Sequence, residues 1–380
     1  MKAILARIAD YIRETDKIML FLCLFTTSFG CMAVLSATHY TRSLRDFFMQ
    51  LFAMAIGLGA AIFLSLFDFE TFIKHWKLFA VVGFVPVLLT FVIGTGPAGT
   101  DDKAWLNLGI TTFQPSELLK ACFIVTFTMH LSKVKDKINK LYYLVPVCAH
   151  GALPVLLIHF QGDDGTAIVF AVMVLCMMWA AGVDKKYFII LFSAMLVAAP
   201  LIYFFVMNPD QQARIQTMFD IEADLQGNGW QQWRGRTALA GGGMWGQGYL
   251  KGNLTQMGPA GVPEGYNDFI FTTIGEELGF VGAFAVVVLL GLITYRCLKI
   301  SKMTNSFSGK LICVGFFGWL IAQIMVNLGM CLSLLPVIGV TLPFFSAGGT
   351  SLSCLYIGVG LVLSVYKHRN SRTVYLHDLK

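Results

Sequence analysis

Ten long apolar runs recur along this 380-residue sequence, and they restrict its fold more than any other feature. A run of roughly 20 apolar residues forms a helix that crosses the hydrocarbon core of a bilayer, about 30 Å thick. The runs cover residues 18–37, 47–67, 78–95, 114–132, 143–160, 165–182, 187–206, 268–295, 311–333 and 349–366. The sequence therefore predicts an all-α integral membrane protein with about ten transmembrane helices.

The composition agrees with this class of protein. Hydrophobic residues make up 56% of the chain and charged residues only 13%, whereas roughly a quarter of a soluble domain is charged. The nine cysteines lie nearly all within apolar runs and form no CxxC pair, and the seven histidines form no cluster with cysteine. The sequence therefore predicts neither a disulfide framework nor a zinc site.

Lysine and arginine are distributed unequally between the two faces of the predicted bundle. Of the 28, 20 lie at the N-terminus, in the C-terminal tail or in loops on the same face, and seven lie in loops of the other face. Cytoplasmic loops carry the excess of positive charge. The pattern predicts that both termini are cytoplasmic, and it explains the net charge of +6 without a nucleic-acid partner.

We expect a single membrane domain over residues 1–380 with three polar parts. Residues 1–17 form an amphipathic segment that we expect along the headgroups, and residues 367–380 form a cytoplasmic tail. Residues 207–267 form a large extracytoplasmic loop between helices 7 and 8 that contains tryptophan, arginine and glycine. Because this loop is the longest polar stretch in an apolar chain, we expect the chemistry there.

Lys120 is the one cation that falls inside a predicted span. A charge at membrane depth is costly, so it should be paired and should face protein or water. Pro115 and Glu117 suit the start of this helix, and Glu117 lies three residues before Lys120 on the same face. Glu276, in the eighth span, is the other candidate partner. Two interpretations stay open: a capped helix with an internal ion pair, or an ion pair that positions a polar site at the outer mouth of the bundle.

The shorter outer loops contain further polar residues. Trp105 stands beside charged residues, although an interfacial anchor is its commoner role. Asp163 and Asp164 precede the sixth span, where one aspartate would cap the helix and leave the other free. The outer segment 334–351 is apolar but broken by prolines and glycines, which suits a re-entrant segment packed against protein.

Five ordered motifs resemble those of the SEDS family (shape, elongation, division and sporulation), the RodA/FtsW/SpoVE group. They are Gln114 to Glu117 with Lys120; Gln161 to Thr166; Trp230 and Gln231 with the glycine-rich stretch 242–248; Pro263 and Glu264 with Asn267 to Phe271 and Glu276 to Gly279; and Asn327 to Met330 with Leu335 to Gly339 and Leu342 to Ser346. The chain departs from the family pattern at Ala104, where arginine is usual, at Gly162, where proline is usual, and at Ala347, where tyrosine is usual. Short tails make it most similar to RodA.

The resemblance implies a peptidoglycan glycosyltransferase that polymerises lipid II on the outer face of the bacterial cytoplasmic membrane, for cell-wall elongation and cell shape. The hydroxyl of one lipid-linked disaccharide would attack the anomeric carbon of the glycan held on undecaprenyl pyrophosphate, with inversion. An alcohol is a poor nucleophile until a base accepts its proton. Asp268 falls on the family's essential aspartate, so we expect it to be the catalytic base. From its position alone, capping of the eighth helix is the commoner role.

The resemblance and the polar loops together indicate the substrate-binding residues. They are Lys103, Trp105, Glu117, Lys120, Asp163, Gln231, Arg236, Glu276 and Ser346. The pyrophosphate leaving group needs cations, which Lys103, Lys120 and Arg236 would supply. Alternatively, Glu117, Asp163 and Glu276 would hold a divalent cation, Mg²⁺ or Mn²⁺. On one continuous helix Glu276 would lie about 80° from Asp268 and roughly 12 Å deeper.

The resemblance also implies a protein partner. SEDS-like polymerases work with a single-span class B penicillin-binding protein, and we expect a lipid-exposed helix, the eighth or ninth, to bind it. Gly275, Gly279 and Gly282 would allow two helices to approach closely. Membrane lipids are the remaining partners, because the predicted helices face them.

Three other functions compete with polymerisation. A lipid II flippase would use the same substrate without a base at Asp268. A scaffold that only recruits a penicillin-binding protein would need neither Asp268 nor Lys120. A glycosyltransferase of the large multispanning type carries its acidic motif in the first outer loop, and residues 38–46 hold one acid here, which argues against that class.

Overall fold

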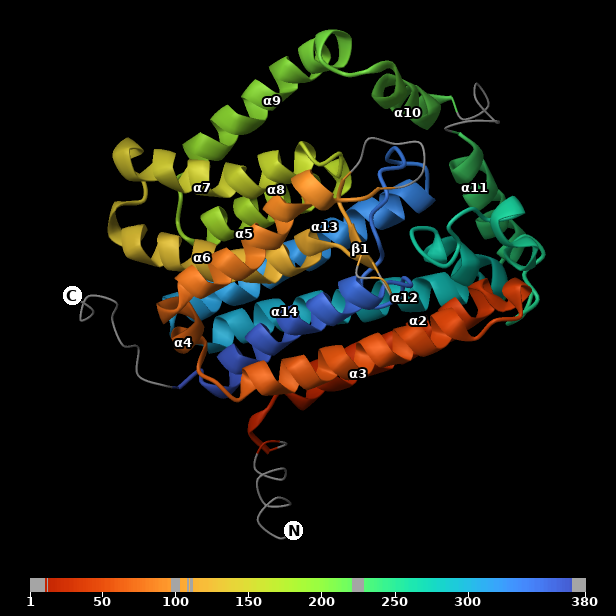
Figure 1. Ribbon diagram of the computed structural model, residues 1–380, viewed down its shortest axis with the longest axis horizontal. Coiled ribbons are helices and arrows are strands. Elements are labelled where there is room, and N and C mark those ends of the chain that lie inside the picture. Colours follow the sequence, from red (N-terminus) through yellow and green to blue (C-terminus); the bar gives the residue numbers. More distant parts are fainter. Residues whose placement is uncertain are drawn as a thin grey trace.

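The computed structural model of the chain describes residues 11, 13–96, 103–107, 109, 112–220 and 229–370 (Figure 1). The long helices are Lys17–Ala37 (α2), Arg45–Ser65 (α3), Trp76–Ile93 (α5), Pro115–Val134 (α6), Leu141–His159 (α7), Asp164–Ala180 (α8), Lys185–Phe205 (α9), Ile270–Met303 (α12), Phe307–Cys331 (α13) and Gly349–Lys367 (α14). Each of them overlaps one predicted span. The prediction of an all-α membrane protein is therefore confirmed.

Within the described ranges, eight of these helices are long and apolar enough to cross a membrane. The other two are α8, which has only 17 residues, and α6. The 20 residues of α6 include Glu117, Lys120 and Lys133, which lower its hydropathy. Most of α6 is nevertheless buried against its neighbours. The low hydropathy of α6 is therefore compatible with a position inside the bundle, where few of its side chains meet lipid.

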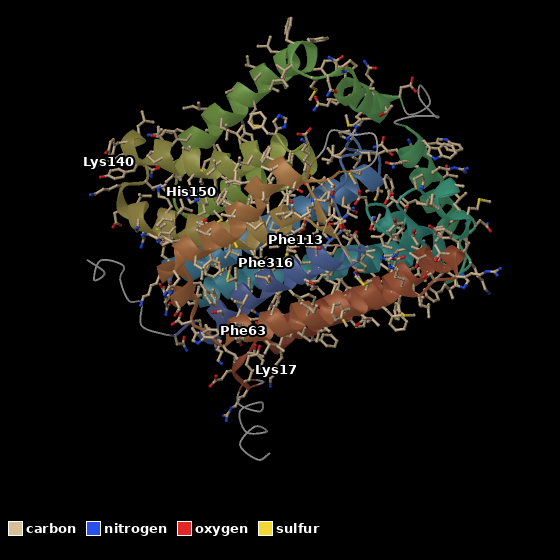
Figure 2. The ribbon with its side chains drawn as sticks, viewed as in Figure 1. Lys17, Phe63, Phe113, Lys140, His150 and Phe316 are labelled. Carbon is tan, nitrogen blue, oxygen red and sulfur yellow. The ribbon has the colours of Figure 1, made fainter. Side chains whose placement is uncertain are left out.

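The centre of the bundle is formed by α6, α13 and α14. Helix α13 packs against α8, α12 and α6, and α14 packs against α3 and α6. Phe316 and Trp319 of α13 are fully buried and in edge-to-face contact, and Figure 2 shows Phe316 among the packed helices. At the periphery, Phe188 is the one buried residue of α9. Helix α9 therefore exposes apolar side chains along nearly its whole length, as a lipid-facing helix does.

Ion pairs join the residues just before α2 to α12 and to α14 at one end of the bundle. Asp16 caps the N-terminus of α2 and pairs with Arg296 of α12, with 2.6 Å between Oδ2 and Nη2. Lys367, at the end of α14, lies 3.6 Å from a carboxylate oxygen of Glu14. Both ends of the described chain therefore lie at the same end of the bundle, as an even number of crossings requires. Most of the predicted amphipathic segment and of the predicted tail lies outside the described residues.

Helix α12 is divided near its N-terminal end. Gly279 has a φ of 67°, in the left-handed region that favours glycine, and the helix changes direction there. The amide N–H of Phe280 instead donates to the carbonyl of Gly243 (2.9 Å), in the loop that packs on the break. Helix α12 also begins after Asp268. The prediction of one continuous helix running inward from Asp268 is therefore wrong.

The loop between α9 and α12 covers one end of the bundle, on the right in Figure 1. Its elements are Pro209–Phe219 (α10), Trp230–Gly242 (α11) and the 3-10 helix Thr255–Ala260 (η4), and α11 packs on α12 while η4 packs on α2. The short strands Leu106–Asn107 (β1) and Thr112–Phe113 (β2) pair antiparallel in the loop before α6. The remaining short helices are His39–Thr41 (η1), Phe69–Lys74 (α4) and Lys135–Lys137 (η2).

The segment between α13 and α14 is irregular, and its second half is largely buried. Val340, Phe344 and Phe345 are all buried. The amide N–H of Ala347 donates to the carbonyl of Tyr266 (2.8 Å), which ties this segment to the loop before α12. The expectation of a broken apolar segment packed against protein is confirmed.

Single cysteines in a cysteine-free background test the orientation of the bundle. Trp245 is 79% exposed in the outer loop, and Lys140 is exposed in the loop between α6 and α7, at the opposite end in Figure 2. A membrane-impermeant maleimide should label Trp245→Cys in intact cells and Lys140→Cys only after the membrane is opened. Labelling of Lys140→Cys from outside would contradict the predicted topology.

Candidate functional site

A cavity of about 1080 Å³ lies at the end of the bundle that the loop between α9 and α12 covers. Its wall is built from the loops before β1 and before α12, from α10 and α11, and from the irregular segment between α13 and α14. Three acidic side chains line it, those of Asp163, Glu264 and Asp268. Arg214 is the one cation that the described part of the chain places in the wall. The cavity is at the upper end of the size range of small-molecule sites.

Asp268 lies in this wall, just before α12. Its backbone carbonyl accepts hydrogen bonds from Asn327 Nδ2 (2.7 Å) and Cys331 Sγ (3.5 Å). The N-cap of α12 is Phe269, so the alternative prediction that Asp268 caps this helix is wrong. Its carboxylate accepts no hydrogen bond from the residues that the structure describes, and a Cβ added at Gly339 would lie 3.5 Å from Oδ2. The backbone is therefore held in place while the carboxylate faces the cavity.

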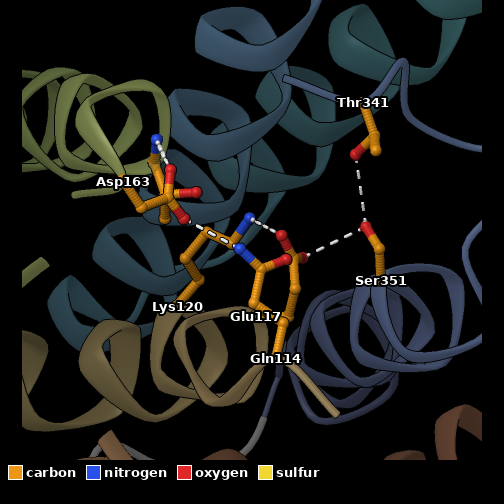
Figure 3. A network of polar contacts seen from close by, with 7 residues as sticks. Gln114, Glu117, Lys120, Asp163, Thr341 and Ser351 are labelled. Carbon is orange, nitrogen blue, oxygen red and sulfur yellow. Dashed lines mark hydrogen bonds and ion pairs between the residues drawn. The ribbon is translucent and has the colours of Figure 1, made fainter. Parts of the chain in front are cut away.

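The neighbouring acids change the proton affinity of this carboxylate. Burial, and then the charges of Glu264 and Asp163, raise the pKa of Asp268 to about 7. Burial also raises the pKa of Asp163, but its carboxylate caps α8 through the Thr166 N–H (2.9 Å) and accepts from the Gln114 amide (2.8 Å) (Figure 3). Asp163 is thus held by its partners, whereas Asp268 can exchange a proton near neutral pH, as a general base must.

Lys120 and Glu117 do not line the cavity, but they belong to a polar network with Ser351 and Thr341, which do (Figure 3). Lys120 is fully buried, with Nζ 2.7 Å from Glu117 Oε1 and 4.9 Å from the centre of the Trp319 ring. Glu117 Oε2 accepts from the Ser351 hydroxyl (3.2 Å), which lies 3.4 Å from the hydroxyl of Thr341. Both hydroxyls line the cavity. The predicted pairing of Lys120 with Glu117 is confirmed. Neither residue of the pair lines the cavity, and the hydroxyls of Ser351 and Thr341 connect Glu117 to it.

Glu276 has a different role from the predicted one. It is fully buried, and its carboxylate accepts hydrogen bonds from the N–H groups of Leu254 (2.7 Å) and Thr255 (2.8 Å) and from the Thr255 hydroxyl (2.7 Å). Glu277 accepts from the same loop. The alternative pairing of Glu276 with Lys120 is wrong. The predicted substrate contact of Glu276 is corrected to a structural one, because its oxygens hold the loop around η4 and lie outside the cavity wall.

The other predicted site residues fall into two groups. Trp105 and Gln231 line the cavity, and Ser346 lies beside it, where its hydroxyl hydrogen-bonds the backbone of both segments that meet there. Lys103 and Arg236 are exposed and lie outside the wall. Neither these two cations nor the buried Lys120 lines the cavity, whereas Arg214 does.

Arg214, Glu264 and Thr341 are among the cavity residues that the predicted substrate-binding set does not contain. Arg214 belongs to α10, whose start is encoded by Asn208 and Gln211 as a capping box. That signal predicts a helix but does not say what the helix faces. Glu264 and Thr341 lie in irregular segments, where no periodicity indicates which side chains point inward.

The profile of the FtsW/RodA/SpoVE family, described as "Cell cycle protein", matches residues 16–371 of this sequence. The chain belongs to the FtsW/RodA/SpoVE family. Among its relatives, the peptidoglycan glycosyltransferase MrdB of Escherichia coli K12 is 33% identical over 288 residues, which cover 74% of this chain and 76% of MrdB. The stage V sporulation protein E of Bacillus subtilis 168 is 28% identical over 360 residues, covering 93% of this chain and 97% of that protein.

Solved structures share the fold of this FtsW/RodA/SpoVE member. The rod-shape-determining protein RodA of Thermus thermophilus is 25% identical and superposes with a TM-score of 0.70, covering 94% of this chain and 98% of RodA. A chain from a structure described as "Structural coordination of polymerization and crosslinking by a peptidoglycan synthase complex" is also 25% identical. Its TM-score is 0.81, with 94% of this chain and 99% of that chain covered. The resemblance to the SEDS family is confirmed.

Replacement of Lys120 by alanine should reduce both stability and activity. Removing one partner of a buried ion pair leaves Glu117 charged and unpaired, which destabilises a protein by about 3–5 kcal/mol. The melting temperature in detergent should fall, and it should recover largely in the double variant Glu117→Gln/Lys120→Met, which removes both charges. An unchanged melting temperature in Lys120→Ala would reject a stabilising role for the pair.

Proposed function

We infer that this chain is a peptidoglycan glycosyltransferase that polymerises lipid II into glycan strands for cell-wall elongation. The observation that carries this inference is the carboxyl of Asp268, which faces a large cavity and has a pKa raised to about 7. The relative MrdB, named for this activity, adds support. Reaction at the outer face of the bacterial cytoplasmic membrane follows from the charge distribution, which gives cytoplasmic termini and an external cavity.

Asp268 acts as the general base of this reaction. The hydroxyl of one lipid-linked disaccharide gives its proton to the carboxylate as its oxygen bonds to the anomeric carbon of the second glycan. The bond from that carbon to the undecaprenyl pyrophosphate breaks, and the electron pair leaves with the pyrophosphate. A single displacement inverts the anomeric centre. A base whose pKa lies near the operating pH is the most effective for such a transfer.

Arg214 supplies positive charge for the pyrophosphate. Its Nη1 makes one long hydrogen bond, 3.4 Å to the carbonyl of Val337, so most of its donors are available to a ligand. A guanidinium matches phosphate oxygens with two parallel N–H groups. The three carboxylates in the wall repel the pyrophosphate from the rest of the cavity, which favours its binding beside Arg214.

A divalent cation, Mg²⁺ or Mn²⁺, would join the pyrophosphate and neutralise its charge. Across the described residues no three acidic, histidine or cysteine side chains come together as a metal site. The residues fit instead a cation held chiefly by pyrophosphate oxygens and water, with a carboxylate such as that of Asp163 as the protein ligand. Glu117 and Glu276 do not fit this role, because both lie outside the cavity wall.

The protein partner is a single-span class B penicillin-binding protein, which crosslinks the polymer. Its proposed contact with Gly275, Gly279 and Gly282 is wrong, because all three are buried within this chain. The exposed face of α12 carries Phe280 and Phe284 instead, which are 60% and 57% exposed. We therefore place the partner helix on the lipid-facing side of the inner part of α12.

Replacement of Arg214 by glutamine should weaken substrate binding. We expect KM for lipid II to rise about tenfold, because one charge-assisted contact of this kind contributes about 1.5–3 kcal/mol. Arg214→Lys should recover part of the loss, and the exposed Arg236→Gln is the matched control with unchanged kinetics. Chelation of divalent cations should slow Arg214→Gln more than the unmodified protein. An unchanged KM in Arg214→Gln would remove this residue from the site.

Replacement of Asp268 by asparagine tests the function itself. Asparagine keeps the size of the side chain but accepts no proton, and a general base contributes about 10²–10⁴-fold. Polymer formation from lipid II by purified protein should fall to near background while lipid II binding survives. In the unmodified protein the rate should fall as the pH drops through about 7, because protonated Asp268 is not a base.

The Asp268→Asn substitution should also change how the stability of the protein depends on pH. Folding raises the pKa of Asp268, so the folded state binds its proton more tightly than the unfolded chain, and stability is lost as the pH rises toward 7. Asp268→Asn should therefore melt no lower than the unmodified protein at pH 8.

Retained polymerisation in folded Asp268→Asn would overturn the assignment of the base. A wild-type protein that moves lipid II but makes no polymer would indicate a flippase, and one that does neither a scaffold.

A further inference from the structure

Asn327 of α13 joins the two segments that meet at the base. It is fully buried, and its amide nitrogen donates to two backbone carbonyls, those of Asp268 and Val340, each at 2.7 Å. One segment leads into α12 and the other lies between α13 and α14. We propose that Asn327 is the positioning residue that fixes the Asp268 carboxylate against residues 337–340 and thereby sets its distance from Arg214. This proposal rests on the proposed function.

The segment 337–340 contacts both groups whose spacing matters. Arg214 donates to the carbonyl of Val337 (3.4 Å), and Asp268 Oδ2 lies near Gly339, 3.5 Å from where a Cβ would stand. Two residues of extended chain span at most about 7 Å. In a single displacement the attacking oxygen, the anomeric carbon and the leaving oxygen lie in a row. A base and a leaving-group cation at opposite ends of that row must keep a fixed spacing, and Asn327 holds the segment that both contact.

The chemistry of the position requires an amide. Both partners of Asn327 are carbonyl oxygens, so one side chain must supply two donors from one point, which the NH₂ group does and a carboxylate or an alkyl group does not. The next turn of α13 makes contacts of the same kind. Cys331 Sγ lies 3.5 Å from the carbonyl of Asp268, and the N–H of Ile338 lies 3.3 Å from Met330 Sδ. One face of α13 thus aligns both segments, and Asn327 makes its shortest contacts.

Two variants of Asn327 test this role. Asn327→Leu removes both donors at similar volume, and Asn327→Asp keeps the shape of the side chain in case leucine prevents folding. Gln323→Leu is the matched control, since Gln323 is a buried amide one turn earlier on α13, outside the cavity wall. The readouts are polymer formation from lipid II, lipid II binding, melting temperature and the pH profile of the rate.

We expect the turnover of both Asn327 variants to fall about 100-fold, the size of effect that a misplaced catalytic group produces. Lipid II binding should change less than about threefold, because Asn327 does not line the cavity. Once released from Gly339, Asp268 becomes more hydrated beside Glu264, Asp163 and Arg214. The acid side of the pH profile should therefore move to lower pH. Gln323→Leu should keep the wild-type rate and profile.

Three results would overturn the proposal. The first is a turnover within about threefold of wild type in either folded Asn327 variant. The second is a fall in rate with an unshifted pH profile, which a merely structural role would give. The third is an equal loss in Gln323→Leu. If wild type makes polymer and Asp268→Asn does not, these results reject the role of Asn327 alone. If wild type makes no polymer, the proposed function fails first.

Discussion

Backbone N–H and C=O groups at membrane depth have no water to bind, so each must find a partner inside the protein. The long helices meet this requirement by themselves. Where the backbone is irregular, other groups supply the partners. At the break in α12, the carbonyl of Gly243 accepts the hydrogen bond of the Phe280 N–H. Near Asp268, the side chains of Asn327 and Ser346 donate to backbone carbonyls. The bonds of Asn327 and Ser346 therefore also hold the two segments that line the cavity around Asp268.

The same requirement separates structural charges from chemical ones. Lys120 forms an ion pair with Glu117, and Arg296 forms one with Asp16. Glu276 accepts hydrogen bonds from backbone N–H groups at the start of η4. Each of these groups is buried and occupied, so it stabilises the bundle or shapes the wall. The carboxylate of Asp268 differs from them, since no described residue donates to it and it is partly exposed to the cavity. A buried charge with its partners in place supports the fold, whereas an acid left without a donor beside a cavity can exchange a proton.

The site was predictable from the sequence in part. The pairing of Lys120 with Glu117 followed from their spacing on one helix, and the choice of Asp268 followed from the family motif. Glu276 was misplaced because helical spacing does not show which neighbouring segment a face of the helix meets, and the face of Glu276 meets the loop around η4. Gly279, expected at a contact between two helices, instead breaks α12 in the left-handed region. A glycine inside an apolar run does not by itself distinguish a break from a close contact between helices.

The sequence alone determined the helices, because run length is a local property of the chain, and the placement of lysine and arginine predicts their orientation. It also identified the acids of the motifs. Only the tertiary structure decided which cation reaches the cavity. Lys103, Arg236 and Arg214 all lie in outer loops, and contacts between segments distant in sequence, such as that of Arg214 with Val337, leave the first two outside and bring the third into the wall. Such contacts join irregular segments whose positions no local pattern encodes.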